Sequence, residues 1–220
     1  MIEKVMSARV NYDMQLKELK NQMLLLGSMV EDVIRETIGA LVNQDVEKAR
    51  EIAESDDKID AQVRNIEQSC YTLLLRQQPI ARDLRTVSAA LKMITDLERI
   101  GDQGADISEL TVLMSSMKYP KEIKLIEEMA KETSVMLIEA VDAFAEENLE
   151  KATQVISKDD VVDDLFVKVK DSIAESVKES DAMTELDLLM VAKYMERIGD
   201  HATNIAEWVI YSITGELPKD

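Results

Sequence analysis

An internal repeat divides this chain of 220 residues into two similar halves. The run Glu-Arg-Ile-Gly-Asp occurs at residues 98–102 and again 98 residues later, at 196–200. The segment at 44–60 aligns without gaps on the segment at 147–163, an offset of 103 residues. The second half has therefore lost five residues between its two matched segments, which indicates a shorter turn between two equivalent helices.

Apolar residues recur at alternating steps of three and four along residues 16–41, which is the spacing of an amphipathic helix. The same spacing resumes after Asp45 and continues through Leu73. Pro79 ends this second helix, because a proline forces the preceding residue toward an extended conformation. A third apolar series predicts a helix over residues 81–114. In the second half the pattern predicts helices over about 121–146, 149–178 and 183–213.

Long helices joined by tight turns run antiparallel, because only then do their apolar seams become buried. A composition of only 6 Gly, 3 Pro and 4% aromatic residues agrees with a helical protein. We predict an all-α fold of two tandem, pseudo-symmetric, antiparallel three-helix bundles with six long helices. The segment at 115–120 is the predicted linker, so that residues 1–116 form the first bundle and residues 117–220 the second.

The charge and the termini exclude several classes of protein. A formal net charge of -18 opposes contact with nucleic-acid phosphates, and no cluster of Lys or Arg with interleaved aromatic residues provides an exception. The first residues lack the apolar core of a signal peptide, and no segment approaches the roughly 18 uncharged apolar residues of a membrane span. Cys70 is the sole cysteine, and we predict an apolar packing role for it. A cytoplasmic protein without direct nucleic-acid binding is expected.

Each half is predicted to gather four acidic residues at one height of a helical hairpin. Asp56 and Asp60 share one helix face, as do Glu98 and Asp102, because each pair is four residues apart. The two pairs lie symmetrically about Pro79, where the hairpin turns. The second half repeats this arrangement about residues 179–180 with Asp159, Asp163, Glu196 and Asp200.

Four carboxylates at one height repel one another unless a cation lies between them. Arg99 and Arg197 project about 100° away from the preceding glutamate, so neither is expected to neutralise its cluster. Oxygen ligands suit hard cations such as Mg²⁺, Ca²⁺, Mn²⁺ or ferric iron, and the scarcity of His and Cys disfavours structural zinc. Asp106 and Asn204, one helical turn further along, are second-tier metal ligands. The alternative is that these acids only solvate exposed helix faces.

No catalytic residue is predicted. The sequence contains no set of nucleophile, base and orienting residue and no Gly-rich phosphate loop. His201 follows Glu196 by five residues and so cannot complete the Glu-x-x-His pattern of ferritin-like di-iron bundles. Gly101 and Gly199 lie within helices, where glycine costs about 1 kcal/mol relative to alanine, and we predict that they allow close helix packing. Trp208 is predicted to anchor the core.

The paired "ERIGD" runs, "SDDKID" with "KDDVVD", and "QQPIARDLR" at 77–85 resemble the signatures of the PhoU family of phosphate-uptake regulators. The resemblance implies a cytoplasmic accessory protein that dampens phosphate import and the phosphate-starvation response. It implies the ATPase subunit of the phosphate ABC transporter and a membrane sensor histidine kinase as partners, contact with the membrane only through them, and a homodimer. It also implies iron or zinc at the repeated acids: Asp56, Asp60, Glu98, Asp102, Asp159, Asp163, Glu196 and Asp200.

The leading interpretation is a regulatory binding module without catalysis. A metal-dependent hydrolase or redox enzyme that uses the paired carboxylates as a multinuclear site is one alternative. A purely structural helical spacer, in which the repeated acids bind nothing, is the other. The second half has no counterpart of "QQPIARDLR", so a partner surface built from that stretch is expected only in the first half.

Overall fold

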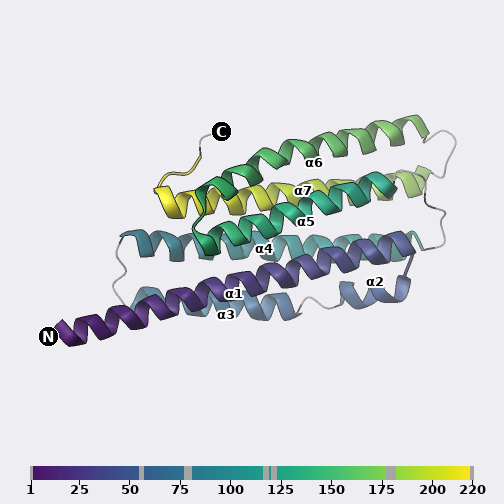
Figure 1. Ribbon diagram of the computed structural model, residues 1–220. Helices are drawn as coiled ribbons and strands as arrows, with labels where there is room; N and C mark the ends of the chain where they lie inside the picture. The colour runs from purple at the N-terminus through teal and green to yellow at the C-terminus, as the bar shows by residue number, and fades with distance from the viewer. Residues whose placement is uncertain are drawn as a thin grey trace.

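A computed structural model describes residues 2–54, 57–76, 81–115, 119, 123–176 and 182–218. The described residues form long helices that lie alongside one another (Figure 1), which confirms the all-α prediction. None of these helices is long and apolar enough to cross a membrane. In chain order the elements are α1 (Ile2–Asn43), α2 (Val46–Ala53), α3 (Asp57–Arg76), α4 (Ala81–Leu113), α5 (Ile123–Glu146), α6 (Leu149–Ser176) and α7 (Ala182–Thr214).

The second predicted helix is divided into α2 and α3, so the expectation of one continuous helix was wrong. Glu54 ends α2 with backbone angles of φ -94° and ψ -1°, and its N–H donates to the Arg50 carbonyl. Ala49 and Ile52 of α2 form a small separate apolar cluster with Ala40 of α1. The apolar spacing hides this break, because it keeps the same phase on both sides.

The turn after the first helix of each half has the same geometry, as the repeat predicts. Gln44 and Glu147 both adopt the left-handed conformation, with φ of 53° and 55°. The next residue caps the following helix in each half: the side chain of Asp45 accepts from the Lys48 N–H, and that of Asn148 accepts from the Lys151 N–H, both at 3.0 Å. The 103-residue offset is therefore a structural equivalence.

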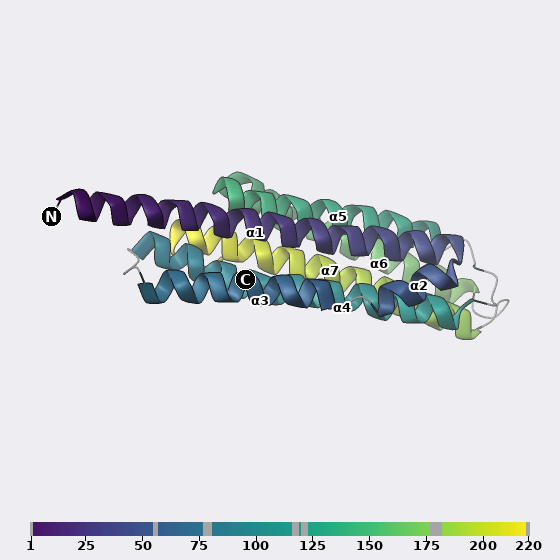
Figure 2. The same ribbon diagram turned by 90° about the horizontal axis from the view of Figure 1, so that it is seen from below.

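The two halves share one apolar core. Buried side chains from α1, α3 and α4 form a single continuous cluster with those from α5, α6 and α7. The halves meet where α1 packs on α5 and α4 packs on α7, and α1 extends beyond the other helices at its N-terminal end (Figure 2). The predicted boundary at residues 116 and 117 lies outside the described residues.

Two sequence predictions about packing are confirmed. A Cβ atom at Gly101 would come within 2.9 Å of Ile59 Cδ1, and one at Gly199 within 3.3 Å of Asp159 Oδ1, so both glycines permit close helix packing. Cys70 is fully buried, and burial raises the pKa of its thiol to about 12, as expected for an apolar packing residue. Trp208 is partly buried against the core and contacts Tyr211 edge to face.

Candidate functional site

The second-half acids gather on one face of the α6–α7 hairpin. Asp159 of α6 lies against Gly199 of α7, which sets the register of the two helices. Asp200 carries the carboxylate that interacts most strongly with Asp159, and Glu196 the one that interacts most strongly with Asp163. These are the pairings expected from the positions of the four residues about the turn. The structure thus places Asp159 near Asp200 and Asp163 near Glu196.

The mutual repulsion in this cluster is visible in its pKa values. Burial, followed by the charges of Asp200 and Asp163, raises the pKa of Asp159 from 3.8 to about 6. The pKa values of Asp163 and Asp200 are also raised, first by burial and then by the charge of Glu196. At neutral pH the cluster therefore holds more negative charge than its surroundings compensate.

Lys193 provides partial compensation at one end of the cluster. Its ammonium group pairs with Glu196 and also lies 5.5 Å from the centre of the Phe166 ring. The charge of Lys193 opposes the rise in the pKa values of Asp163 and Asp200 but does not reverse it. At the far end of the cluster, the neighbouring Thr203 hydroxyl opposes the rise in the pKa of Asp159.

In the first half, arginines pair with the described aspartates of the predicted cluster. Arg64 Nη1 lies 3.2 Å from Asp60 Oδ2, and Arg99 Nη1 lies 3.2 Å from Asp102 Oδ2. The expectation that Arg99 would not neutralise its cluster was wrong, because its long side chain reaches forward three residues along the helix to Asp102. Glu98 is half-buried on the same helix, and Asp56 lies outside the described residues.

The two halves are therefore chemically unequal at equivalent positions. Val167 occupies the second-half position that corresponds to Arg64 of the first half. Asp163, the equivalent of Asp60, consequently has no arginine one turn further along its helix. Among the described residues, Asp60 therefore has an arginine partner that its equivalent Asp163 lacks.

The second-tier residues lie between the halves, where α4 faces α7. Asn204 Nδ2 donates to Asp96 Oδ1 at 3.3 Å. Asp106 lies near Tyr194, and burial followed by the charge of Asp106 raises the pKa of Tyr194. These two contacts occupy equivalent positions of the repeat. Asp106 and Asn204 therefore join α4 to α7, which differs from the predicted role in extending the acidic clusters.

Sequence reasoning missed a polar contact at this boundary. His201 Nδ1 lies 2.8 Å from Asp96 Oδ1, with only 19% and 15% of the two side chains exposed. His201 and Asn204 are three residues apart and so share one helix face, and this spacing was the sequence signal that could have indicated a polar contact there. The partner on α4 could not be identified without knowing which helices pack together.

Residues of the "QQPIARDLR" stretch also make contacts between the two halves. Arg82 pairs with Glu147 of the α5–α6 turn, which also accepts a 2.7 Å contact from Lys20. Arg85 Nε donates to the Ser212 carbonyl of α7 at 3.4 Å. Residues 77–80 of this stretch lie outside the described residues, but both described arginines bind the second half.

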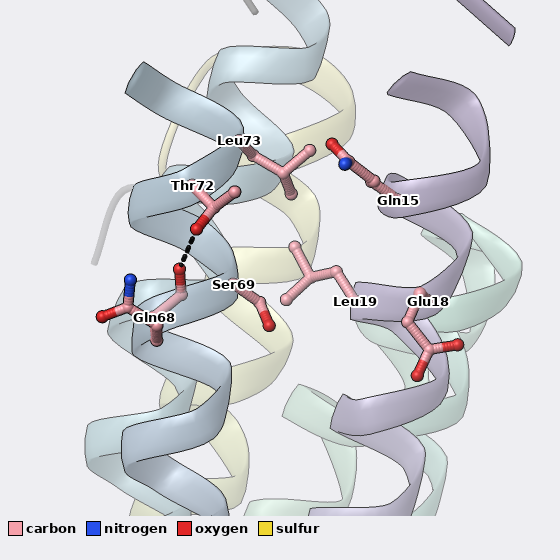
Figure 3. Close-up of a pocket in the computed structure, with 7 residues that line it drawn as sticks. All are labelled: Gln15, Glu18, Leu19, Gln68, Ser69, Thr72 and Leu73. Atoms are coloured by element: carbon pink, nitrogen blue, oxygen red, sulfur yellow. Dashed lines mark hydrogen bonds between the residues drawn. The ribbon is translucent and has the colours of Figure 1, made fainter. Parts of the chain in front are cut away.

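Three hollows of the described surface are lined by none of the eight predicted metal ligands. One hollow of about 200 Å³ lies between α1 and α3 (Figure 3), with the buried side chains of Leu19 and Leu73 facing each other across it. Thr72 closes one side by donating to the Gln68 carbonyl. Within the described part of the chain, no group of three or more His, Cys, Asp or Glu side chains is arranged to hold one metal ion.

Both halves match one known domain. A sequence model of the PhoU domain matches residues 23–111 and 126–209. The phosphate-specific transport system accessory protein PhoU homolog of Clostridium acetobutylicum is 36% identical over 208 residues, which cover 93% of this chain and 95% of the relative. The PhoU homolog 1 of Thermotoga maritima is 34% identical over 214 residues, with coverages of 96% and 92%.

Solved structures agree with these sequence matches. The crystal structure of PhoU from Pseudomonas aeruginosa has a TM-score of 0.87 at 31% identity, and the match covers 93% of this chain and 100% of that one. The phosphate transport system regulatory protein PhoU from Streptococcus pneumoniae has a TM-score of 0.88 at 28% identity, with coverages of 94% and 99%. With both halves matched in sequence and nearly the whole chain matched in fold, this chain belongs to the PhoU family.

Proposed function

We propose that this protein is a non-enzymatic, cytoplasmic regulator of phosphate uptake that acts through protein contacts. It lowers the activity of the phosphate ABC transporter and dampens phosphate-starvation signalling. Its partners are the transporter's ATPase subunit and a sensor histidine kinase, and it reaches the membrane only through them. The observation that carries this proposal is the match to named accessory proteins of the phosphate-specific transport system over more than nine tenths of the chain.

The surface of the described residues favours a binding module over an enzyme. Three hollows between its helices have volumes of about 170 to 230 Å³. Sites for small-molecule substrates typically enclose about 300–1,000 Å³. Long helices around a continuous core instead present extended surfaces, which suit contacts with other proteins.

A binding assay with purified partners tests the regulatory proposal. We expect the ATPase subunit of the phosphate transporter from the same organism to be retained by immobilised protein, and the transporter's ATP hydrolysis to fall when the protein is added. The cytoplasmic region of the sensor kinase is the second partner to be tested for binding to the immobilised protein. Failure of both partners to bind at low salt, with and without phosphate, would contradict the proposal.

We also propose that the second-half acids bind a cation. Asp159, Asp163, Glu196 and Asp200 supply oxygen ligands, and Lys193 compensates only part of their charge, which suits a hard cation such as Mn²⁺, Mg²⁺, Ca²⁺ or ferric iron. The family resemblance adds iron or zinc as candidates. Arg64 and Arg99 reduce the need for a cation in the first half, so we expect weaker binding there.

Thermal unfolding with added metal tests the cation proposal. A cation that binds only the folded protein raises the melting temperature by mass action. We expect the rise with Mn²⁺, Fe³⁺ or Zn²⁺ to be lost in Asp159→Asn/Asp200→Asn and largely kept in the matched variant Asp60→Asn/Asp102→Asn. Unchanged melting of the wild-type protein would favour the structural-spacer alternative. Metal-dependent turnover of a substrate would favour the enzyme alternative.

A homodimer is part of the proposed function, and it follows from the family resemblance. Light scattering at several protein concentrations checks it, with twice the 24.8 kDa chain mass as the expected result. A mass of one chain at every concentration would remove the dimer from the proposal while leaving the partner contacts untouched.

A further inference from the structure

Helices α1 and α5 lie side by side where the two halves meet (Figures 1 and 2). A hollow of about 170 Å³ opens between them. Gly27 and Val141 lie at its floor, and a Cβ atom at Gly27 would come within 3.0 Å of both Val141 methyl groups. The missing side chain at Gly27 therefore lets α1 and α5 approach closely. It also leaves the hollow above them unfilled.

The walls of this hollow are apolar side chains exposed on the surface. Leu24 of α1 is 37% exposed and Ile138 of α5 is 43% exposed. Leu25, beside Leu24 on the outer side of α1, is 54% exposed. Residues 21–30 contain no charged residue, although 32% of the chain is charged. Leu24 and Ile138 therefore give the hollow an apolar wall that is open to solvent.

The internal repeat shows that packing of α1 on α5 does not require this apolar surface. The repeat relates Leu24 to Glu127, Leu25 to Glu128 and Ile138 to Arg35. Glu127, Glu128 and Arg35 are exposed charged residues on the same two helices. Charged side chains are thus tolerated at these positions, and the apolar ones call for another explanation.

The rim of the hollow is acidic. Glu31 and Asp142 line it, and each makes a long ion pair: Arg35 Nε lies 3.7 Å from Glu31, and Lys151 Nζ lies 3.9 Å from Asp142. A second copy of this chain, which also has a net charge of -18, would bring a second acidic rim to this surface. A cationic occupant avoids that repulsion.

We propose that the α1–α5 hollow binds an amphipathic helix of a basic partner protein. One large aliphatic or aromatic side chain fills the hollow above Gly27 and Val141, since an apolar cavity of about 150 Å³ can hold a benzene ring. Lysine or arginine residues on either side of it pair with Glu31 and Asp142. This inference rests on the proposed function, because it describes how a partner of the transport system is held.

A designed peptide tests the surface directly. The probe is a helical peptide of about 18 residues with a central phenylalanine on an alanine face and flanking lysines, and its control has glutamates in place of the lysines. We expect the lysine peptide to bind the full chain with micromolar affinity. Leu24→Glu/Ile138→Arg, which installs the residues found at the equivalent positions and keeps the net charge, should weaken binding at least tenfold.

The matched control is Val161→Glu/Val167→Arg, which replaces two exposed valines of α6 without changing the net charge. This variant should bind the lysine peptide like the wild-type protein. Equal binding by Leu24→Glu/Ile138→Arg, equal binding of the glutamate peptide, or no binding at about 1 mM peptide would overturn the proposal. Conversion of a dimer to a monomer by Leu24→Glu/Ile138→Arg would also overturn it, because the surface would then join two copies.

The intact ATPase subunit separates this inference from the proposed function. If the subunit binds the wild-type protein and Leu24→Glu/Ile138→Arg equally, the proposed regulatory role stands, but the proposal that the partner binds at the α1–α5 hollow is wrong. If the subunit binds neither protein while the peptide binds as expected, the α1–α5 hollow remains a binding site, but the ATPase subunit is not its partner. Circular dichroism should show equal helicity for all variants.

Discussion

At the scale of single residues, equivalent carboxylates acquire different properties from their neighbours. Asp60 has Arg64 one turn along its own helix, whereas its equivalent Asp163 faces Glu196 across the hairpin. Asp159 is the most perturbed member of the second-half cluster, because burial and three acidic neighbours act in the same direction. Local repulsion of this kind destabilises the folded protein at neutral pH until a cation or a proton relieves it.

Replacing Asp159 with asparagine should therefore stabilise the metal-free protein. The pKa of Asp159 is raised from 3.8 to about 6 in the folded state, so the cost of its charge is fully present above pH 6 and disappears toward pH 4. After solvent screening we expect Asp159→Asn to raise the free energy of unfolding by about 1 kcal/mol at pH 7.5 and to have little effect at pH 4.

Urea unfolding at both pH values, in the presence of chelator, measures this difference. Asp160 is the exposed neighbour of Asp159, and the control variant Asp160→Asn should change stability little at either pH. A loss of stability in Asp159→Asn at pH 7.5 would show that the carboxylate makes a favourable contact that outweighs the repulsion.

At the scale of helices, small residues determine how closely neighbouring helices approach. A Cβ atom at Gly104 of α4 would lie 2.7 Å from Val33 Cγ1 of α1. Thr37 of α1 completes this contact by donating to the Gly104 carbonyl at 3.3 Å. Valine has a stiff side chain and cannot easily move aside. The spacing of α1 and α4 therefore depends on the absence of a side chain at position 104.

Two glycine substitutions separate packing from helix propensity. Gly104→Ala should lower the free energy of unfolding by about 1 kcal/mol, because overpacking costs more than the roughly 1 kcal/mol that alanine contributes within a helix. Gly39→Ala should instead raise stability by about 0.5–1 kcal/mol, since no atom lies within 4 Å of the added methyl group. Chemical unfolding compares the two, and a gain in both variants would mean that Val33 moves freely.

At the scale of the whole molecule, polar contacts fix how one half sits on the other. Glu147 of the α5–α6 turn binds Lys20 of α1 and Arg82 of α4. The side-chain hydrogen bond from Lys20 is the largest cause of the lowered pKa of Glu147. His201 and Asp96 provide a second link between α7 and α4. These contacts lie around a core that is continuous between the halves.

Glu147→Gln should weaken the whole fold because it removes the charge shared by two cations. We expect a loss of about 1 kcal/mol at pH 7, discounted for the exposure of the site. A lowered pKa contributes stability above the ordinary value of 4.5 that is lost as pH falls, so wild type and variant should converge near pH 3.

Thermal and urea unfolding at pH 7 and pH 3 check this prediction. Glu175→Gln, at an exposed position of α6, is the control and should leave stability unchanged. If the difference in stability between the wild type and Glu147→Gln were as large at pH 3 as at pH 7, Glu147 would act by packing and not by its charge.

The sequence alone determined the helical class, the repeat and the register within each hairpin. Apolar spacing, capping residues and turn positions are local signals, so they placed Asp159 opposite Asp200 and Asp163 opposite Glu196. The break between α2 and α3 escaped detection because the apolar phase continues across it. Arg99 was misjudged because the direction of its Cα–Cβ bond says little about where a long, flexible side chain ends.

Only the tertiary structure decided how the halves meet and which surfaces stay open. The packing of α4 on α7 and of α1 on α5 joins helices far apart in the chain. Such packing depends on the fit of complete side-chain surfaces, which no local spacing encodes. Asp96 with His201, Glu147 between Lys20 and Arg82, and the hollow above Gly27 all arise from that fit.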